Sequence, residues 1–150
     1  MDDPYNLQRF VDAQWPVYER VCRELRQGRK QSHWMWFIFP QIKGLGPSEM
    51  AQKFAISSPE EAEAYLAHPI LGPRLKECTR IVAELEAHSA EDIFGYPDDM
   101  KFRSSMTLFA RGAVDKDKNK DKDKEIFQRC LEKYFRGEPD RLTLAALPNF

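Results

Sequence analysis

The sequence predicts an all-α fold: an irregular bundle of about seven helices with short connections, forming a single domain over residues 1–150. Apolar residues recur at spacings of three and four along most of the chain, as on the buried face of a helix. Helix-start residues precede several of these runs, and no two alternating runs flank a hairpin turn. With 42% hydrophobic and 31% charged residues, the chain can fill one core and still present a solvated surface.

Two separate or kinked helical pieces are predicted first, over about residues 6–14 and 16–27. Pro16 divides them, because proline lacks an N–H and clashes inside a helix but fits the first position of a new one. Gly28 ends the second piece, since glycine readily adopts the backbone conformation that follows a helix.

The run from Trp34 to Phe39 is wholly apolar, so it is interior whether it forms a helix or a strand. Ser32 as an N-cap and Pro40 as a terminator favour a short buried helix. In the alternative strand, every second residue of the run would share one face.

The later helical segments follow from their start residues and apolar spacing. Ser58, for example, is an N-cap followed by proline and two glutamates in the first turn. The predicted segments run from Pro47 or Ser48 to Phe54, from Ser58 to Ala67, over 70–87, from Ser89 to Gly95, from Asp98 to Arg111 and from Ile126 to Phe135.

Residues 115–124 alternate lysine with aspartate, or once with asparagine, and form the only low-complexity segment. Their spacing resembles the start of a calcium-binding EF-hand loop. However, the sixth position is Lys120 instead of glycine, and the twelfth is Ile126 instead of glutamate. We therefore expect a solvated, flexible loop without a calcium site.

The net charge and the cysteine positions argue against several kinds of binding partner and against a metal site. Lys plus Arg number 23 and Asp plus Glu 24, so the formal net charge is −1. The chain therefore lacks the broad positive field with which proteins attract anionic membranes or nucleic acids, and we expect neither as a binding partner. Cys22, Cys78 and Cys130 are far apart, and neither they nor the histidines have metal-ligand spacing. The sequence has no run of membrane-span length and no signal-like start, so we expect a cytoplasmic protein, with the nucleus as the alternative.

A candidate anion-binding segment lies between a predicted helix end and a predicted helix start. Arg29 and Lys30 supply two cations and Ser32 a hydroxyl, and the free N–H groups of the next helix attract phosphate or carboxylate. His33 is the only histidine in this polar and aromatic cluster, which makes it a catalytic acid–base candidate. In the structural alternative, the two cations stabilise the carboxyl end of the preceding helix.

A second polar cluster occupies the predicted helix from Asp98. Asp99 is its candidate catalytic carboxylate, unless the charged residues simply pair with one another. The ligand-binding candidates combine both clusters with aromatic and amide side chains: Arg29, Lys30, Ser32, Trp34, Trp36, Gln41, Asp98, Lys101, Arg103, Ser104 and Ser105. We expect Arg29 or His33 to lie within side-chain reach of residues 98–105, around a concavity.

A further anion site is one interpretation of the turn from Gly44 to Ser48, with Lys43 beside it. Glycine permits close approach of a ligand to the backbone. The pattern is not that of a P-loop, and a purely structural turn is the alternative.

Several long motifs resemble the domain-of-unknown-function family 1810, over about Phe10 to Leu144. They are residues 23–30, 32–41, 44–46, 64–69, 71–75, 93–95 and 98–109. The resemblance implies a mainly α-helical single domain and carries no established activity. Members are sometimes labelled calpastatin-like, but this chain has one core and no repeat, unlike disordered inhibitory segments. The chain is also remotely similar to small helical domains that process N-linked ADP-ribose, although no glutamate aligns with their catalytic one.

Two functions are compatible with these observations. The first is a polar and aromatic pocket that binds a phosphorylated, nucleotide-like small molecule of the ADP-ribose type, with or without a reaction on it. The alternative is a noncatalytic protein-interaction adaptor whose polar motif is a structural network. A surface patch of exposed apolar residues would favour the adaptor. No motif identifies a cofactor.

Overall fold

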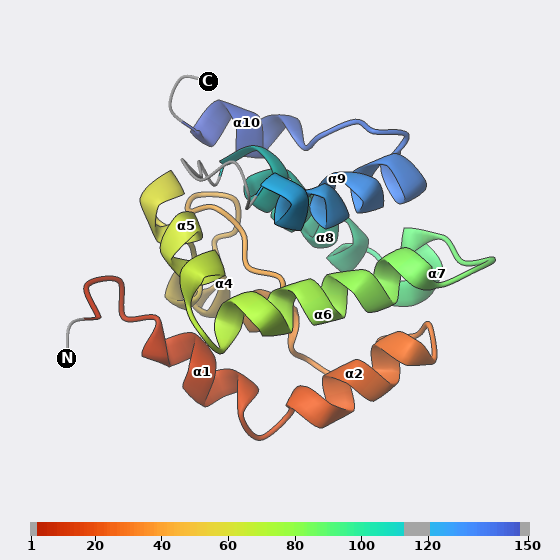
Figure 1. Cartoon of the computed structure of the whole chain (residues 1–150), viewed down its shortest axis with the longest axis horizontal. Coiled ribbons are helices and arrows are strands. Elements are labelled where there is room, and N and C mark those ends of the chain that lie inside the picture. Colours follow the sequence, from red (N-terminus) through yellow and green to blue (C-terminus); the bar gives the residue numbers. More distant parts are fainter. Residues whose placement is uncertain (1–2, 113–120, 148–150) are drawn as a thin grey trace.

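The computed structural model describes residues 3–112 and 121–147 and confirms the all-α class (Figure 1). These residues form ten α-helices, more than the seven or so predicted, and several of the ten are only about one turn long. The helices are α1 (Gln8–Gln14), α2 (Tyr18–Arg26), α3 (Met35–Ile38), α4 (Glu49–Lys53), α5 (Pro59–Ala67), α6 (Leu71–Glu84), α7 (Ala90–Phe94), α8 (Asp98–Thr107), α9 (Asp121–Phe135) and α10 (Arg141–Ala146). A π-helical turn, η1 (Leu108–Gly112), extends α8, and the only β pairing of the described residues is a bridge between Ile42 and Ile56.

Side-chain caps set several helix starts. The Ser58 and Ser89 hydroxyls accept the backbone N–H three residues further on, at 3.1 and 3.0 Å, as predicted for α5 and α7. Asp140 caps α10 in the same way at 2.9 Å. Helix α10 was not predicted, because it is only six residues long and includes the exposed Leu142 and Leu144.

The apolar run after α2 is buried as predicted, except for Trp36, which is half-buried. Trp34, Met35 and Phe39 are each at most 1% exposed. The predicted N-cap is wrong, however, because α3 begins at Met35 and the Ser32 hydroxyl donates a hydrogen bond to Glu24 instead.

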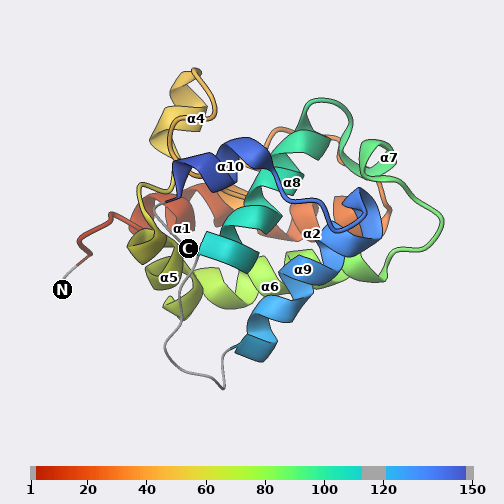
Figure 2. The same ribbon diagram turned by 90° about the horizontal axis from the view of Figure 1, so that it is seen from above.

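Helix α6 crosses the middle of the molecule and packs against α2, α5 and α9, while α8 packs against α3, α7, α9 and α10 (Figures 1 and 2). Three core rings join these elements. The centroids of Phe39 and Phe102 are 5.0 Å apart, and Phe94 lies 5.9 and 4.6 Å from them. These contacts fasten the segment after α2 to α7 and α8, so the two predicted polar segments become neighbours.

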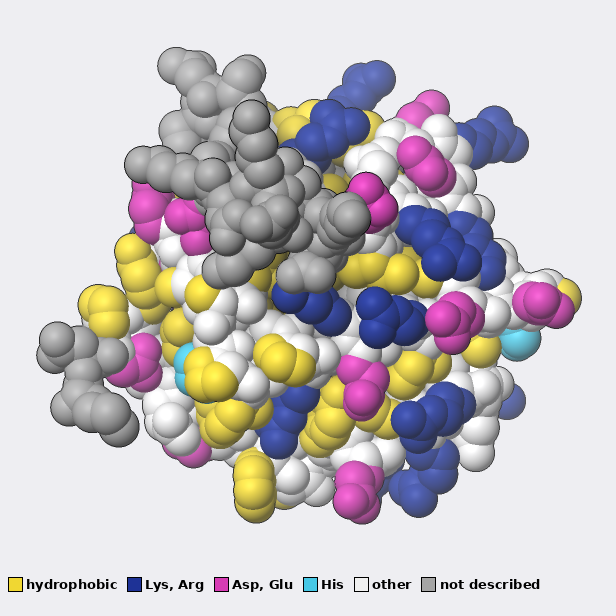
Figure 3. All heavy atoms as spheres, viewed as in Figure 1, with side chains coloured by type: hydrophobic (Ala, Val, Ile, Leu, Met, Phe, Trp, Pro, Cys, Tyr) yellow, Lys and Arg dark blue, Asp and Glu magenta, His cyan; other side chains and the backbone are white. Residues whose placement is uncertain are grey.

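The Lys/Asp-rich segment is only partly described. Residues 115–120 lie outside the described ranges, and α9 begins at Asp121, inside the segment predicted as a loop. On the face shown in Figure 3, basic and acidic side chains are interspersed, in keeping with the small net charge. None of the helices within the described ranges combines the length and the apolar composition that a membrane span requires.

Candidate functional site

A buried carboxylate organises the first polar segment. Glu24, on α2, is 4% exposed and accepts four hydrogen bonds. The donors are the Gln31 and Ser32 backbone N–H groups at 2.7 and 3.0 Å, the Ser32 hydroxyl at 2.6 Å and the Trp34 indole N–H at 3.0 Å. Glu24 thereby fixes the chain between α2 and α3.

The same four donors hold the Glu24 carboxylate in its charged form. Burial by itself raises the pKa of Glu24, but the hydrogen bonds from Ser32, Gln31 and Trp34 outweigh it and lower the pKa below its ordinary value. Glu24 was not among the predicted site residues, because nothing in the sequence pattern of α2 distinguishes a glutamate that faces inward.

Two lysines from separate segments converge on Asp98. Lys30 Nζ lies 2.9 Å from Asp98 Oδ2, and Lys101 Nζ lies 3.3 Å from Asp98 Oδ1. Each ammonium also faces an indole, with Lys30 Nζ 5.2 Å from the Trp34 ring centroid and Lys101 Nζ 5.1 Å from that of Trp36. We call these five residues the lysine cluster. Two cations share one carboxylate there, so the cluster keeps one net positive charge.

Only part of the lysine cluster faces solvent. The side chains of Lys30 and Lys101 are 8% and 27% exposed, Trp34 is buried, and Trp36 is half-buried. Three first-turn N–H groups of α8 are occupied: that of Asp99 donates to the Gly95 carbonyl, and those of Met100 and Lys101 donate to the Pro97 carbonyl. An anion at this surface would therefore be bound by the lysines and not by the helix terminus.

Arg103 lies on the other side of α8 from Lys101, because residues two apart on a helix are about 200° apart. Its guanidinium donates to the Glu138 carbonyl at 3.0 Å and carboxylate at 3.4 Å, and lies 5.5 Å from the Phe135 ring centroid. The structure does not bring Arg103 to the lysine cluster.

The two serines of α8 are buried but differ in hydrogen bonding. Ser104 Oγ donates to the Met100 carbonyl at 3.1 Å. Ser105 Oγ has no hydrogen-bond partner among the described residues, although Ser105 is 0% exposed. Ser105 lies one turn beyond Lys101, on the helix face that carries the lysine cluster.

Lys30, instead of Arg29 or His33, makes the expected contact with the start of α8. The Lys30 N–H donates to the Ile93 carbonyl of α7 at 2.7 Å, which places the lysine beside α8. Arg29 and His33 are exposed, and no side-chain hydrogen bond or ion pair joins either to another described residue. Asp99 is half-buried and accepts from the next backbone N–H at 2.9 Å.

Gln41 belongs to a different concavity. It lines a pocket of about 410 Å³ between the turn that contains Gly44 and the helix α4, with Ile42, Lys43, Gly46, Ala51, Gln52 and Ala55. This pocket includes the turn proposed as a further anion site and none of the lysine cluster. In the described part of the chain, no group of three or more His, Cys, Asp or Glu is arranged to hold a metal ion.

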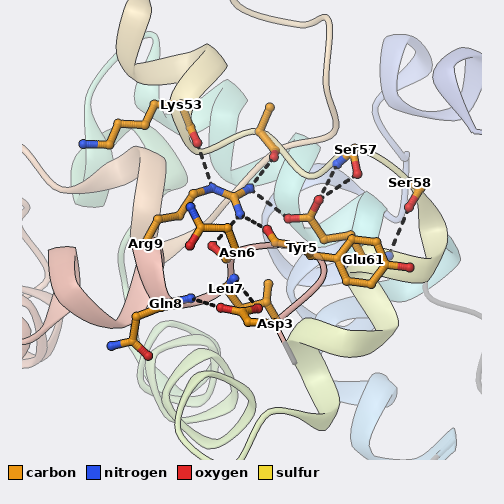
Figure 4. Close-up of polar contacts among 11 residues, drawn as sticks. Asp3, Tyr5, Asn6, Leu7, Gln8, Arg9, Lys53, Ser57, Ser58 and Glu61 are labelled. Carbon is orange, nitrogen blue, oxygen red and sulfur yellow. Dashed lines mark hydrogen bonds and ion pairs between the residues drawn. The ribbon is translucent and has the colours of Figure 1, made fainter. Parts of the chain in front are cut away.

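Arg9 is the centre of a second polar network that sequence analysis missed (Figure 4). Its guanidinium donates to four backbone carbonyls, among them those of Lys53 and Ala55 at 2.8 Å, and pairs with the Glu61 carboxylate at 2.8 Å. Glu61 is 2% exposed and also accepts from the Ser57 N–H and hydroxyl. With its donors satisfied inside the protein, Arg9 ties α1 to the segment between α4 and α5 and has a structural role.

The fold and the lysine cluster define a small all-α domain with a surface-reaching cationic and aromatic cluster. The chain belongs to the DUF1810 family of proteins of unknown function, whose model matches residues 4–147. It is similar to the crystal structure of the conserved hypothetical protein Rv1873 from Mycobacterium tuberculosis, with 53% sequence identity and a TM-score of 0.89. The similarity covers 99% of this chain and all of that one. No curated protein matches the chain.

Proposed function

We propose that the chain binds a phosphorylated, nucleotide-like small molecule of the ADP-ribose type at the lysine cluster. The observation that supports this function is the convergence of Lys30 and Lys101 on the single carboxylate of Asp98, which leaves one positive charge beside solvent. A phosphate that approaches Lys101 adds the missing negative charge and accepts charge-assisted hydrogen bonds. Asp99 and His33 are the acid–base residues of this proposal for any reaction on the ligand.

The two tryptophans have different roles in this proposal. Trp36 is half-buried, so the open part of its ring is the surface on which a base or ribose packs. Trp34 is 1% exposed and donates its indole N–H to Glu24, so it positions Lys30 and does not touch the ligand. The buried hydroxyl of Ser105, which has no partner among the described residues, lies one turn beyond Lys101 on the same face of α8.

A cytoplasmic or nuclear location is part of the same proposal. The three cysteines are free and buried, a state that a reducing compartment maintains.

The test compares ligand binding by the parent protein and by Lys101→Ala, using calorimetry and thermal shift with ADP-ribose, AMP and inorganic phosphate. Lys53→Ala is the matched control, because Lys53 Nζ also lies over an aromatic ring, 5.3 Å from the Phe54 centroid, but outside the lysine cluster. We expect ADP-ribose to bind, Lys101→Ala to weaken it at least tenfold, which corresponds to about 1.4 kcal/mol, and Lys53→Ala to leave it unchanged.

The ligands distinguish which part of the molecule is recognised. Binding of inorganic phosphate as tight as that of ADP-ribose would show that the cluster is a phosphate site without nucleotide recognition. Absence of binding by all three ligands, or equal binding by Lys101→Ala and the parent, would contradict the proposal and favour the adaptor function.

A further inference from the structure

A second arginine is held in place at the surface but not paired. Arg74, on α6, has its Cζ 4.7 Å from the Tyr18 ring centroid and 5.9 Å from that of Trp15. Its Nη1 donates to Gln14 Oε1 at 3.3 Å. Gln14 is 1% exposed, and its Nε2 is bonded to two further buried acceptors, so the amide oxygen that holds Arg74 is itself fixed. The guanidinium is therefore positioned before any partner arrives.

The hydrogen bonds of Arg74 contrast with those of Arg9. Arg9 donates to four carbonyls and a carboxylate. Arg74 has one hydrogen-bond acceptor and no carboxylate within 4.0 Å among the described residues, although a guanidinium has five N–H groups. Glu77, about one turn along α6, accepts from the Tyr18 hydroxyl at 2.7 Å instead of pairing with Arg74. Arg74 is thus a cation with most of its donors open.

Apolar side chains surround this cation. Trp15 is 73% exposed and Ile70 is 37% exposed. Ile70 precedes Arg74 by four residues, so the two side chains are neighbours on one face at the start of α6. In Figure 3, hydrophobic side chains gather where α1 turns into α2 and below the start of α6, with a basic side chain among them. Tryptophan, tyrosine and arginine are the residues that dominate binding energy at protein interfaces.

We propose that this corner, defined by Trp15, Tyr18, Ile70 and Arg74, docks an acidic peptide segment of a partner protein. Charge complementarity selects this occupant: the open guanidinium fork matches a carboxylate, which accepts two parallel hydrogen bonds from it. A neighbouring aliphatic side chain of the peptide covers Trp15 and Ile70. The proposal does not depend on the lysine cluster, which shares no residue with this corner.

The experiment follows the indole N–H of Trp15 by ¹⁵N NMR, with Trp15→Ala used to assign the signal. The probe is the acetylated and amidated hexapeptide Ser-Glu-Leu-Leu-Glu-Ser, and the comparison peptide has glutamine in place of both glutamates. We expect the acidic peptide to shift the Trp15 signal saturably and the neutral one to bind at least tenfold more weakly.

The variant Arg74→Gln tests the residue that the proposal assigns. It should bind the acidic peptide at least tenfold more weakly. Arg80→Gln, the matched control, removes an exposed arginine further along α6 and should bind like the parent. Ring-current-shifted methyl signals report whether each variant keeps the parent fold.

The proposal fails if the acidic peptide gives no saturable shift, if the two peptides bind equally, or if a folded Arg74→Gln binds like the parent. It also fails if the Trp15 signal shifts with protein concentration alone, because a second copy of the chain would then cover the corner.

Discussion

Removing the Glu24 carboxylate should strongly destabilise the fold. In Glu24→Ala the Trp34 indole N–H stays buried without an acceptor, at a cost of about 1–3 kcal/mol. The other three donors, from Gln31 and Ser32, lie in partly exposed residues that water can reach, and each costs about 0.5–1.5 kcal/mol. The sum is about 2.5–7.5 kcal/mol, a large share of the stability of a domain of this size.

Glu24→Gln should cost much less, about 1–2 kcal/mol, because the amide oxygen can accept the three bonds now made to Oε1 while the Ser32 hydroxyl rotates to accept from the amide nitrogen. The assay is urea unfolding followed by circular dichroism at pH 7. Glu19→Ala, an exposed glutamate on the same helix, is the control and should stay within about 0.5 kcal/mol of the parent.

The pH dependence provides a second measurement on the same residue. The folded-state pKa of Glu24 is lowered, so its contribution to stability is fully present above the unfolded-state pKa and is lost as the pH falls through the folded-state pKa. The difference in unfolding free energy between the parent and Glu24→Gln should therefore shrink on acidification. A loss below about 1 kcal/mol in Glu24→Ala, or equal losses in the alanine and glutamine variants, would refute this reasoning.

Four further substitutions test other parts of the fold by the same unfolding assay. Phe37→Ala should cost about 3–5 kcal/mol, because it leaves a cavity in the core, and tolerance within about 1 kcal/mol would place the residue at the surface. Ser105→Ala should not destabilise, since it removes a buried hydroxyl without a partner, and a loss above about 1 kcal/mol would reveal a hidden bond. Gly28→Ala should cost more than about 1 kcal/mol, because φ is +72° and its Cβ would lie 2.5 Å from the His88 ring, so unchanged stability would contradict this geometry. Arg9→Ala should cost about 3–5 kcal/mol by leaving Glu61 buried and unpaired, whereas a change typical of a surface residue would contradict its structural role.

Local signals in the sequence were sufficient to predict the all-α fold class and the positions of most helices along the chain. Ser58 and Ser89 cap their helices through bonds made within three residues, so their sequence neighbours determine them. The burial of five of the six residues from Trp34 to Phe39 also follows from composition, because leaving so many apolar side chains in water would cost too much free energy. Helix ends were less predictable: the long segment predicted from Asp98 changes to a π turn at Leu108, where α8 meets α9 and α10.

The sequence was sufficient to predict which segments of the chain form the candidate site, but not which side chains contact one another there. The sequence indicated two polar clusters beside core residues, one over residues 29–33 and one over residues 98–105. The contact of Phe39 with Phe102 in the core makes the segments that carry them neighbours. Which cation makes the contact depends on backbone direction, and the bond from the Lys30 N–H to the Ile93 carbonyl selects Lys30 over Arg29.

Long-range partners decided the roles of the charged residues. Arg9 and Arg74 are both partly buried arginines near the ends of helices, and nothing in their local sequence separates them. Glu61 is 52 residues from Arg9 and satisfies it, whereas Gln14, 60 residues from Arg74, holds that guanidinium and leaves most of its donors open. Hydrophobic periodicity in the sequence indicates which side of a helix is buried. Only the tertiary structure brings together groups so distant in the chain, and these pairings determine the net charge that each site presents to a ligand.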